Sequence, residues 1–174
     1  PAGGRIVRDE SGQPIGMFEE RAMGPIRNAY NEYLATLSQE ELQQKWREAI
    51  DLAQEECLKK GITSFQDAGS SFKEIADYTA MAENGEFDLR LWAMLRHSSQ
   101  QMKGKADNAR VIDAGDKYFT CRAIKSEVDG ALGAYGAWLL EEYSDMPGEY
   151  GLETLPMDYV LEISRAGLEK GFQV

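Results

Sequence analysis

The sequence predicts an α/β fold, in which parallel strands alternate with helices in βαβ units after a short lead-in. Three features support this prediction: strand-like apolar runs alternate with runs of helical periodicity, serine–glutamate capping boxes precede helical runs, and glycines end them. Because such units are right-handed and bury both faces of a sheet, we expect a parallel sheet covered by helices. We expect one structural domain, with a lead-in at residues 1–37 and the βα units at residues 38–174.

The lead-in combines two short extended runs with one helical run. A polar turn from Asp9 to Gly12 separates the extended runs and predicts a β-hairpin. The second strand contains Pro14, so it is expected to be an edge or irregular strand. A weaker helical pattern follows at residues 21–36, with Pro25 near its start.

Two S-x-x-E capping boxes mark the next helix starts. Ser38 opens a helix whose apolar residues recur at helical spacing and which ends at Gly61. A short strand is expected at residues 62–65, and Asp67 then follows its end. Ser71 opens a second helix, which ends at Asn84 and Gly85.

The remaining elements continue the alternation. Large side chains predict a strand at residues 89–96, a less regular pattern predicts a helix over residues 100–113, and a third strand is expected at residues 119–125. After a long loop, a helix is expected over residues 156–171, and residues 172–174 begin another strand.

Two architectures contain three such units and the opening of a fourth strand. One is half of an eight-stranded (β/α) barrel, and the other is a small doubly wound sheet. The apolar run at the end of the sequence favours the barrel, because a core strand needs partners on both sides.

Composition restricts the partners. The chain has 174 residues, 43% of them hydrophobic and 28% charged, which is typical of a globular domain. Its formal charge of −11 repels phosphate backbones and anionic lipids, so we expect neither nucleic acid nor a membrane as partner. No apolar run approaches a membrane span, and no signal-peptide pattern is present, so we expect a cytoplasmic protein.

Cysteine and histidine usage restrict the chemistry further. Cys57 and Cys121 are far apart and outside any C-x-x-C spacing, so they are expected to be reduced thiols. His97 is the one histidine, whereas the usual zinc sites use two or more. Metal chemistry would therefore need oxygen ligands or ligands from other sequence.

Lys125 is the strongest candidate from position alone. Alternation along the third strand places it on one face with Cys121, Ala123 and Glu127. If that face points inward, Lys125 lies at the carboxyl end of a parallel strand, where barrel and open α/β enzymes place their chemistry. The alternative is a lysine that reaches solvent or pairs with Glu127 or Asp129.

Three further polar residues follow predicted strands. Asp67 and Asp129 would converge on the same rim of the sheet, although each could equally cap a turn or helix. His97 follows the second strand, and its alternative role is that of a structural hydrogen-bonding group.

Four collinear stretches resemble a branch of the amidohydrolase superfamily, the predicted metal-dependent amidohydrolases that include N-substituted formamide deformylases. At residues 124–137, IKSEVDGALGAYGA resembles I-K-x-x-x-D-G-A-L-G-S-R-G-A. At residues 143–148, YSDMPG resembles Y-S-D-x-P-G, and at residues 61–69, GITSFQDAG resembles G-I-T-S-x-x-D-A-G. Residues 4–16 resemble the family's G-x-I-x-R-D-x-x-G-x-P-x-G stretch.

The resemblance implies a TIM-barrel fold and hydrolysis of amide-like C–N bonds by a metal-activated hydroxide. Lys125 would be a metal ligand in carboxylated form, bridging divalent metals such as zinc or iron. Asp129 would orient the loop or contact the substrate. The candidates on the substrate side are Asp67, His97, Asp129 and Tyr135.

Two departures from the family pattern matter. Ala134 and Tyr135 replace the family's S-R, so an arginine that could meet an anionic substrate is absent and the substrate class is open. The family's H-x-H pair, its later histidine and its catalytic aspartate are expected outside these 174 residues. The resemblance thus implies the middle of an enzyme.

We therefore carry three hypotheses. In the first, the chain is a segment of a metal-dependent amidohydrolase acting on a small amide-like molecule, and it is inactive alone. In the second, it is a non-catalytic α/β module that binds a small molecule at the strand ends. In the third, two copies pair to close a barrel, because open sheet edges favour association.

Overall fold

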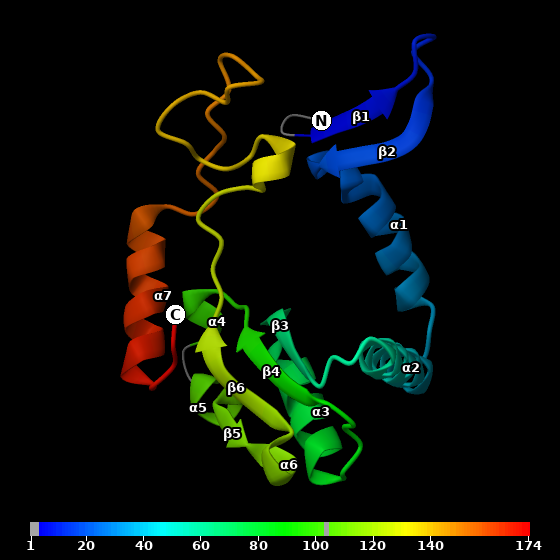
Figure 1. Cartoon of the computed structure of the whole chain (residues 1–174), viewed down its shortest axis with the longest axis vertical. Helices are drawn as coiled ribbons and strands as arrows, with labels where there is room; N and C mark the ends of the chain where they lie inside the picture. The colour runs from blue at the N-terminus through cyan, green and yellow to red at the C-terminus, as the bar shows by residue number, and fades with distance from the viewer. Residues whose placement is uncertain (1–3, 103–104) are drawn as a thin grey trace. The chain divides into compact units, whose positions relative to one another are not determined.

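The computed structural model describes residues 4–102 and 105–174, which fold as two compact units divided between Leu52 and Ala53 (Figure 1). The division expected at residue 37 stays a prediction. Each unit is described by itself below.

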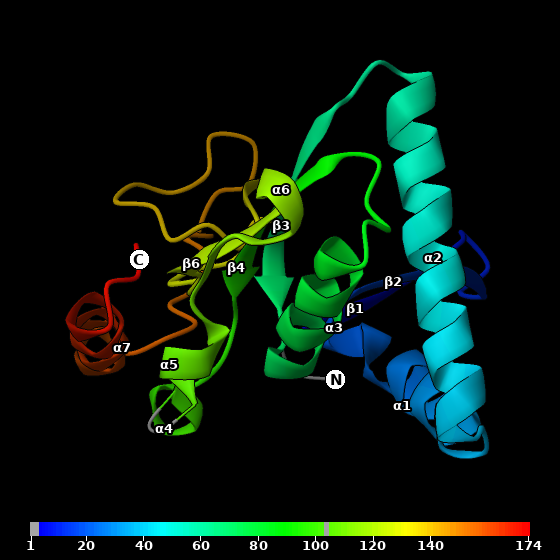
Figure 2. The same cartoon turned by 90° about the horizontal axis from the view of Figure 1, so that it is seen from below.

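The second unit contains a four-stranded sheet with the strand order β3-β4-β6-β5. Strands β3 (Ser64–Ser70), β4 (Arg90–Leu95) and β6 (Phe119–Ile124) are parallel, and β5 (Val111–Asp113) is antiparallel to β6. Figure 2 shows β3, β4 and β6 side by side with α3 (Phe72–Glu83) next to them. The predicted parallel βαβ sheet is therefore confirmed.

Local sequence signals account for the helix boundaries. Helix α2 (Gln39–Lys59) begins after Ser38, whose backbone N–H donates to the Glu41 carboxylate at 2.8 Å. At α3, the Glu74 N–H donates to Ser71 Oγ at 3.2 Å, and the Ser71 N–H donates to the Glu74 carboxylate at 2.7 Å. These reciprocal bonds satisfy N–H groups that a helix leaves unpaired. Both predicted capping boxes are confirmed.

Helix α7 (Met157–Glu169) packs closely on the last parallel strand. A Cβ atom built on Gly167 would lie 2.7 Å from Cδ1 of Ile124, so a glycine at this position permits the close approach. The chain then turns at Gly171, with φ +76°, and Gln173 pairs with Ala123 in parallel. A single parallel bridge thus lies where the start of another strand is predicted.

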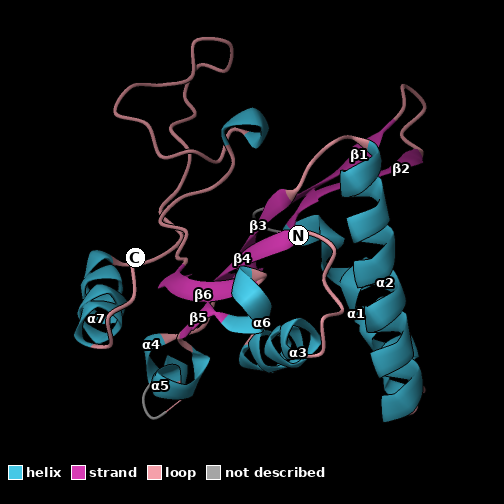
Figure 3. Ribbon diagram, turned by 60° about the horizontal axis from the view of Figure 1, so that its bottom comes forward, coloured by secondary structure: helices cyan, strands magenta, loops and turns pink. Residues whose placement is uncertain are grey.

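The first unit is a hairpin followed by a helix, as the turn chemistry predicts. Strands β1 (Gly4–Arg8) and β2 (Pro14–Glu20) are antiparallel and are drawn in magenta in Figure 3. The Asp9 carboxylate accepts hydrogen bonds from the Ser11 side chain and from the backbone of Ser11 and Gln13. These donors, above all the Ser11 hydroxyl, hold the pKa of Asp9 below its ordinary value. A 3₁₀ turn η1 (Arg21–Met23) leads into α1 (Gly24–Ala35), which has no buried residues.

The helix expected over residues 100–113 is corrected. The structure has two short helices, α4 (Ser99–Met102) and α5 (Ala106–Ala109), and then β5, which pairs Val111 with Cys121. Residues 103–104 of the prediction lie outside the described residues. Strand pairing by Val111 and Ile112, both β-branched, overrides the weak helical pattern.

A left-handed turn, α6 (Ala114–Lys117), connects β5 to β6. Gly115 has φ +58°, and a Cβ atom there would lie 2.0 Å from the carbonyl oxygen of Ala82 in α3. The contact with α3 therefore requires glycine at this position, and the left-handed backbone conformation favours it.

The core lies between the sheet and α3. Leu91 and Ala93 of β4 pair in register with Phe119 and Cys121 of β6, and all four are buried. Tyr78 of α3 contacts Phe119, with 5.7 Å between the ring centroids. This side of the sheet is called the helix-covered face below.

Candidate functional site

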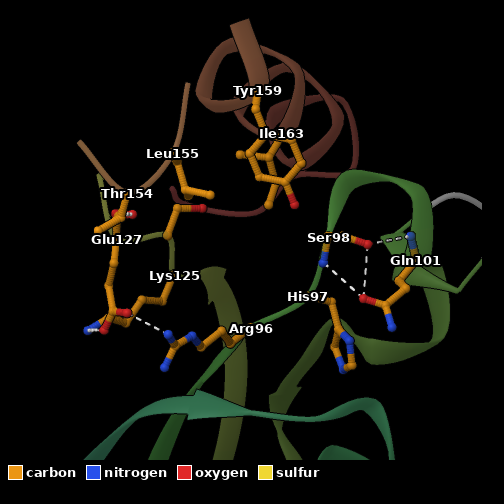
Figure 4. Close-up of a pocket in the computed structure, with 11 residues that line it drawn as sticks. Arg96, His97, Ser98, Gln101, Lys125, Glu127, Thr154, Leu155, Tyr159 and Ile163 are labelled. Atoms are coloured by element: carbon orange, nitrogen blue, oxygen red, sulfur yellow. Dashed lines mark hydrogen bonds and ion pairs between the residues drawn. The ribbon is translucent and has the colours of Figure 1, made fainter. Parts of the chain in front are cut away.

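A pocket of about 380 Å³ opens at the carboxyl ends of β4 and β6 (Figure 4). Arg96 and Lys125, which directly follow the two strands, contribute to its lining together with Glu127. Thr154 and Tyr159 line it from the end of the long loop and the start of α7. Carboxyl ends of parallel strands are where α/β folds place their binding sites.

A β-bulge in β6 determines which way Lys125 faces. Cys121 pairs with Ala93, but Ala123 pairs with Met94, so the register shifts between these pairs. Cys121 therefore belongs to the helix-covered face, whereas Ala123 shares the opposite face with Met94. The predicted common face is wrong for Cys121, because simple alternation does not survive a bulge, whereas Lys125 shares the face of Ala123 beyond it.

The backbone of Lys125 still belongs to the sheet. Its N–H donates to the carbonyl of Leu95 at 2.9 Å, one residue beyond the end of β6. This bond fixes Lys125 at the strand end, and Ile124 before it is buried against α7. The Lys125 side chain is 30% exposed and lines the pocket.

Three charged groups meet at the pocket. Nζ of Lys125 lies 3.2 Å from Oε1 of Glu127, and the Arg96 guanidinium donates to the other oxygen, Oε2. Figure 4 shows Glu127 between the two cations. Of the alternatives left open for Lys125, the structure shows the pairing with Glu127, and it also places the side chain in the pocket.

His97 lines the pocket but its ring is engaged elsewhere. Nε2 accepts a hydrogen bond from the Phe72 N–H at 3.0 Å, and the ring stacks on Phe72 with 4.3 Å between centroids. Phe72 is the first residue of α3, so His97 satisfies one of the N–H groups left unpaired at a helix start. This bond places the imidazole proton on Nδ1 and makes His97 part of the α3 cap.

Asp67 lies inside β3 and not beyond its end, so its expected position at the rim is wrong. The strand continues to Ser70, and Asp67 pairs with Ala93 on the helix-covered face. Its carboxylate accepts a hydrogen bond from Ser70 Oγ at 2.8 Å and lies 3.5 Å from the Tyr78 hydroxyl. Burial, and then the charge of Asp67, raise the pKa of Tyr78 far above its ordinary value. Asp67 is not among the pocket-lining residues.

Asp129 and Tyr135 organise the long loop, drawn in pink in Figure 3. The Asp129 carboxylate accepts a hydrogen bond from the Trp138 N–H at 3.1 Å, across a turn that contains η2 (Leu132–Ala134). Tyr135 has φ +57°, and its hydroxyl donates to Asp145 at 3.3 Å. Neither residue lines the pocket, so their predicted contact with a substrate remains a prediction.

The sequence analysis missed Arg96. The signal that singled out Lys125 applies to it equally, because Arg96 is the charged residue directly after a parallel strand. Tyr159 was also missed, since its contribution depends on where the helix after the long loop packs.

The described residues do not by themselves fit a metal ion. Within residues 4–102 and 105–174, no three side chains of histidine, cysteine, aspartate or glutamate lie close enough together to hold one. Both cysteines are free thiols, as predicted. Lys125 could contribute only part of a metal site.

The helices of the described part of the chain were compared with the requirements of a membrane-spanning helix. None of its helices combines the length and the apolar character that crossing a bilayer requires.

Comparison with known proteins identifies similar chains. The sequence model of the amidohydrolase family matches residues 1–174. The Arabidopsis thaliana "Protein LONG AFTER FAR-RED 3" is 28% identical over 192 residues, covering 100% of this chain and 30% of that protein. The Bacillus subtilis (strain 168) protein named "Putative amidohydrolase YtcJ" is 26% identical over 179 residues, covering 100% of this chain and 31% of that protein.

Two solved structures share the fold. An uncharacterized metal-dependent hydrolase from Pyrococcus furiosus matches with a TM-score of 0.66 and 24% identity, covering 95% of this chain and 33% of that one. Another from Pyrococcus horikoshii OT3 matches with a TM-score of 0.67 and 22% identity, covering 95% and 32%. The chain thus spans about a third of the length of the relatives it matches.

Proposed function

The chain belongs to the amidohydrolase family, and we propose that it forms the central part of a metal-dependent hydrolase that cleaves C–N bonds other than peptide bonds. The observation that carries this proposal is the position of Lys125, at the carboxyl end of a parallel strand and in a charged pocket. The substrate would be a small amide-like molecule, and the location would be the cytoplasm.

We further propose that the parallel sheet is part of a (β/α)8 TIM barrel. Gln173 donates its N–H to the carbonyl of Arg122 and accepts from the N–H of Ile124, both at 2.8 Å. These bonds form a single parallel bridge on the edge of β6 opposite β4, the same edge on which β5 pairs with Cys121. Continuation of parallel pairing beyond β6, with helices between the strands, is the pattern that closes such barrels.

In this proposal, Lys125 supplies one oxygen-donating ligand after reaction with carbon dioxide. The lone pair of the neutral amine bonds to the carbon, and conversion of the ammonium to the carbamate releases two protons to solvent. The metal, zinc or iron, would supply Lewis-acid activation. The other ligands would come from parts of the protein outside the described residues, so the 174 residues alone would be inactive.

A second candidate function is a binding module without catalysis. It is favoured by one observation, that the Lys125 amine is held by Glu127 at 3.2 Å. Such a module would bind a small molecule in the same pocket and would need no metal.

The test uses the full-length protein and its Lys125→Ala variant. Lys59, an exposed residue of α2 paired with Glu55, provides the matched control Lys59→Ala. Bound metal is measured by mass spectrometry, and hydrolysis is measured with 4-nitroacetanilide, a chromogenic non-peptide amide. The proposal expects metal and hydrolysis in the wild type and the control, and loss of both in Lys125→Ala. Metal content that is unchanged in Lys125→Ala would reject Lys125 as a ligand, and a wild type without bound metal or hydrolysis would favour the binding module.

A further inference from the structure

We propose that the pocket at the carboxyl ends of β4 and β6, in the form that the structure shows, binds the carboxylate group of a small molecule with an apolar body. Arg96 is the main donor to that carboxylate, and the Lys125 ammonium is the second. This inference goes beyond the proposed function and needs no metal. It rests on the proposed function in one respect, that carboxylation of Lys125 would remove one of the two cations.

The first step is the charge of the pocket. Two cations, Arg96 and Lys125, line it with one carboxylate, that of Glu127, so the charged side chains leave a surplus of one positive charge. The chain as a whole is acidic, with a formal charge of −11, and no lysine or arginine lies between Lys125 and Arg165. A local positive surplus in such a chain is the complement of an anionic group.

The second step is the supply of hydrogen-bond donors. Both oxygens of Glu127 are engaged, Oε2 by the Arg96 guanidinium and Oε1 by Nζ of Lys125 at 3.2 Å. Within the described residues, these contacts to Glu127 are the polar contacts that the two cationic side chains form. A guanidinium and an ammonium each carry more N–H donors than one such contact uses. Charged donors therefore remain for a ligand, and a carboxylate can accept two of them from one guanidinium.

The third step is how Arg96 is held. Its backbone N–H donates to the carbonyl of Ser70 at 3.0 Å, at the end of β3. A Cβ atom built on Gly69 would lie 3.3 Å from Cδ of Arg96, so the stem passes directly over a residue without a side chain. The side chain is still 55% exposed, so a ligand can reach it. Because its position is set before a ligand arrives, less conformational entropy is lost on binding.

The fourth step is the rest of the ligand. Leu155, Tyr159 and Ile163 line the pocket, and Figure 4 shows them above Arg96 and Lys125. The volume of about 380 Å³ is that of a small-molecule site. A doubly charged anion such as phosphate would be repelled more strongly by the neighbouring Glu127 than a single carboxylate is. A small monocarboxylate with an apolar body is therefore the ligand class that fits.

Carboxylation of Lys125 and binding of a carboxylate oppose each other. The carbamate would replace one cation by an anion, so the charged side chains would carry a surplus of one negative charge instead of one positive charge. By linkage, a carboxylate ligand that prefers the ammonium form also lowers the carboxylated fraction of Lys125.

The experiment measures the binding of 3-phenylpropanoate to the full-length protein by ligand-observed NMR titration. The control ligand is 4-phenylbutan-2-one, in which a neutral methyl ketone replaces the carboxylate. Neither molecule contains a C–N bond, so hydrolysis does not enter the measurement. Lys125→Arg keeps a cation at position 125 that does not become carboxylated. Arg90→Gln is the control variant, because Arg90 lies at the opposite end of β4, over the Tyr118 ring.

We expect Lys125→Arg to bind 3-phenylpropanoate about tenfold tighter than the ketone, because charged hydrogen bonds are lost with the carboxylate. In that background, Arg96→Gln should weaken carboxylate binding about tenfold and leave ketone binding unchanged, and Arg90→Gln should change neither. Glu127→Gln should act in the opposite direction and tighten carboxylate binding, because it removes the anion that competes for the same donors.

Equal affinity of Lys125→Arg for the two ligands, or carboxylate binding unchanged by Arg96→Gln, would overturn the inference. Should Arg96→Gln fail to fold, Glu127→Gln decides, because tighter carboxylate binding supports the inference and unchanged or weaker binding overturns it. The wild type separates this inference from the proposed function. Carboxylate binding as tight as in Lys125→Arg supports the inference and counts against carboxylation of Lys125, whereas weaker binding than in Lys125→Arg supports both.

Discussion

The helix-covered face of strands β4 and β6 and the carboxyl ends of the same strands contribute differently to the molecule. The face contributes to stability, and the ends contribute to the pocket. On the helix-covered face, Ala93, Phe119 and Cys121 are 0% exposed and pack toward α3. At the carboxyl ends of the same strands, Arg96 and Lys125 are partly exposed and share one carboxylate. In each strand, the buried apolar residues lie only a few positions before the charged residue that lines the pocket.

This difference teaches where a substitution should act. Burial of large apolar side chains supplies most of the stability of a domain, whereas exposed ion pairs supply little. Substitutions on the helix-covered face should therefore change the free energy of unfolding, and substitutions at the pocket should change binding or catalysis. The four predictions below run from the largest expected change in that free energy to the smallest.

Phe119→Ala should be the most destabilising change, by about 3–5 kcal/mol, because it leaves a cavity in the core. The ring contacts Tyr78 and Phe87, with centroids 5.7 and 6.5 Å apart. Urea unfolding measures the effect, and Phe119→Leu, which refills most of the volume, is the control. A loss below about 1 kcal/mol would mean that this face is not the main source of stability.

Alkaline pH should weaken the same face through Cys121. Burial raises the pKa of its thiol to about 12, so the unfolded chain releases the proton at lower pH than the folded one. The stabilisation is thus complete below the ordinary thiol pKa and is lost as pH rises toward 12, at about 1 kcal/mol per pH unit.

The measurement is the free energy of unfolding between pH 8 and pH 11 (about the range over which an ordinary thiol ionises). Cys121→Ala should reduce the slope, and Cys57→Ala, at a half-buried position, should not. The slope should not vanish, because Tyr78 also has a raised pKa. Equal slopes in the wild type and Cys121→Ala would contradict the assignment.

Ser71→Ala should cost about 1 kcal/mol, since it removes the acceptor for the Glu74 N–H at the start of α3. Ser71→Asp keeps an acceptor and should restore most of the stability. The check is the thermal midpoint of the three proteins, and a destabilised Ser71→Asp would show that the hydroxyl has another role.

Lys125→Met should change the free energy of unfolding by less than about 1 kcal/mol, because it keeps the stem and removes only a partly exposed ion pair. Urea unfolding checks this beside Phe119→Ala. A cost above about 2 kcal/mol would show that Lys125 contributes to stability as the core residues do, and would remove the contrast between the helix-covered face and the pocket.

The fold was predictable wherever the residues that determine an element lie close together in the sequence. Ser38 and Ser71 each carry a capping box within four residues, and both helices begin where predicted. The true end of β3 and the existence of β5 depend on pairing with distant strands, so local patterns placed them wrongly. The bulge before Ala123 is likewise a property of the paired strands and not of β6 alone.

The site was predictable in part for the same reason. Strand-end position singled out Lys125, and the structure places it in the pocket. The engagement of His97 with the start of α3 and the reach of Arg96 across Gly69 follow only from packing. Residues whose roles depend on several elements are the ones that sequence patterns miss.

The central claim is that Lys125 is carboxylated in the full-length protein. The most direct measurement is ¹³C NMR of that protein after exchange with ¹³C-bicarbonate. We expect a carbamate signal in the wild type and in Lys59→Ala, and no such signal in Lys125→Ala. A wild type without the signal, or a Lys125→Ala protein that retains it, would contradict the claim.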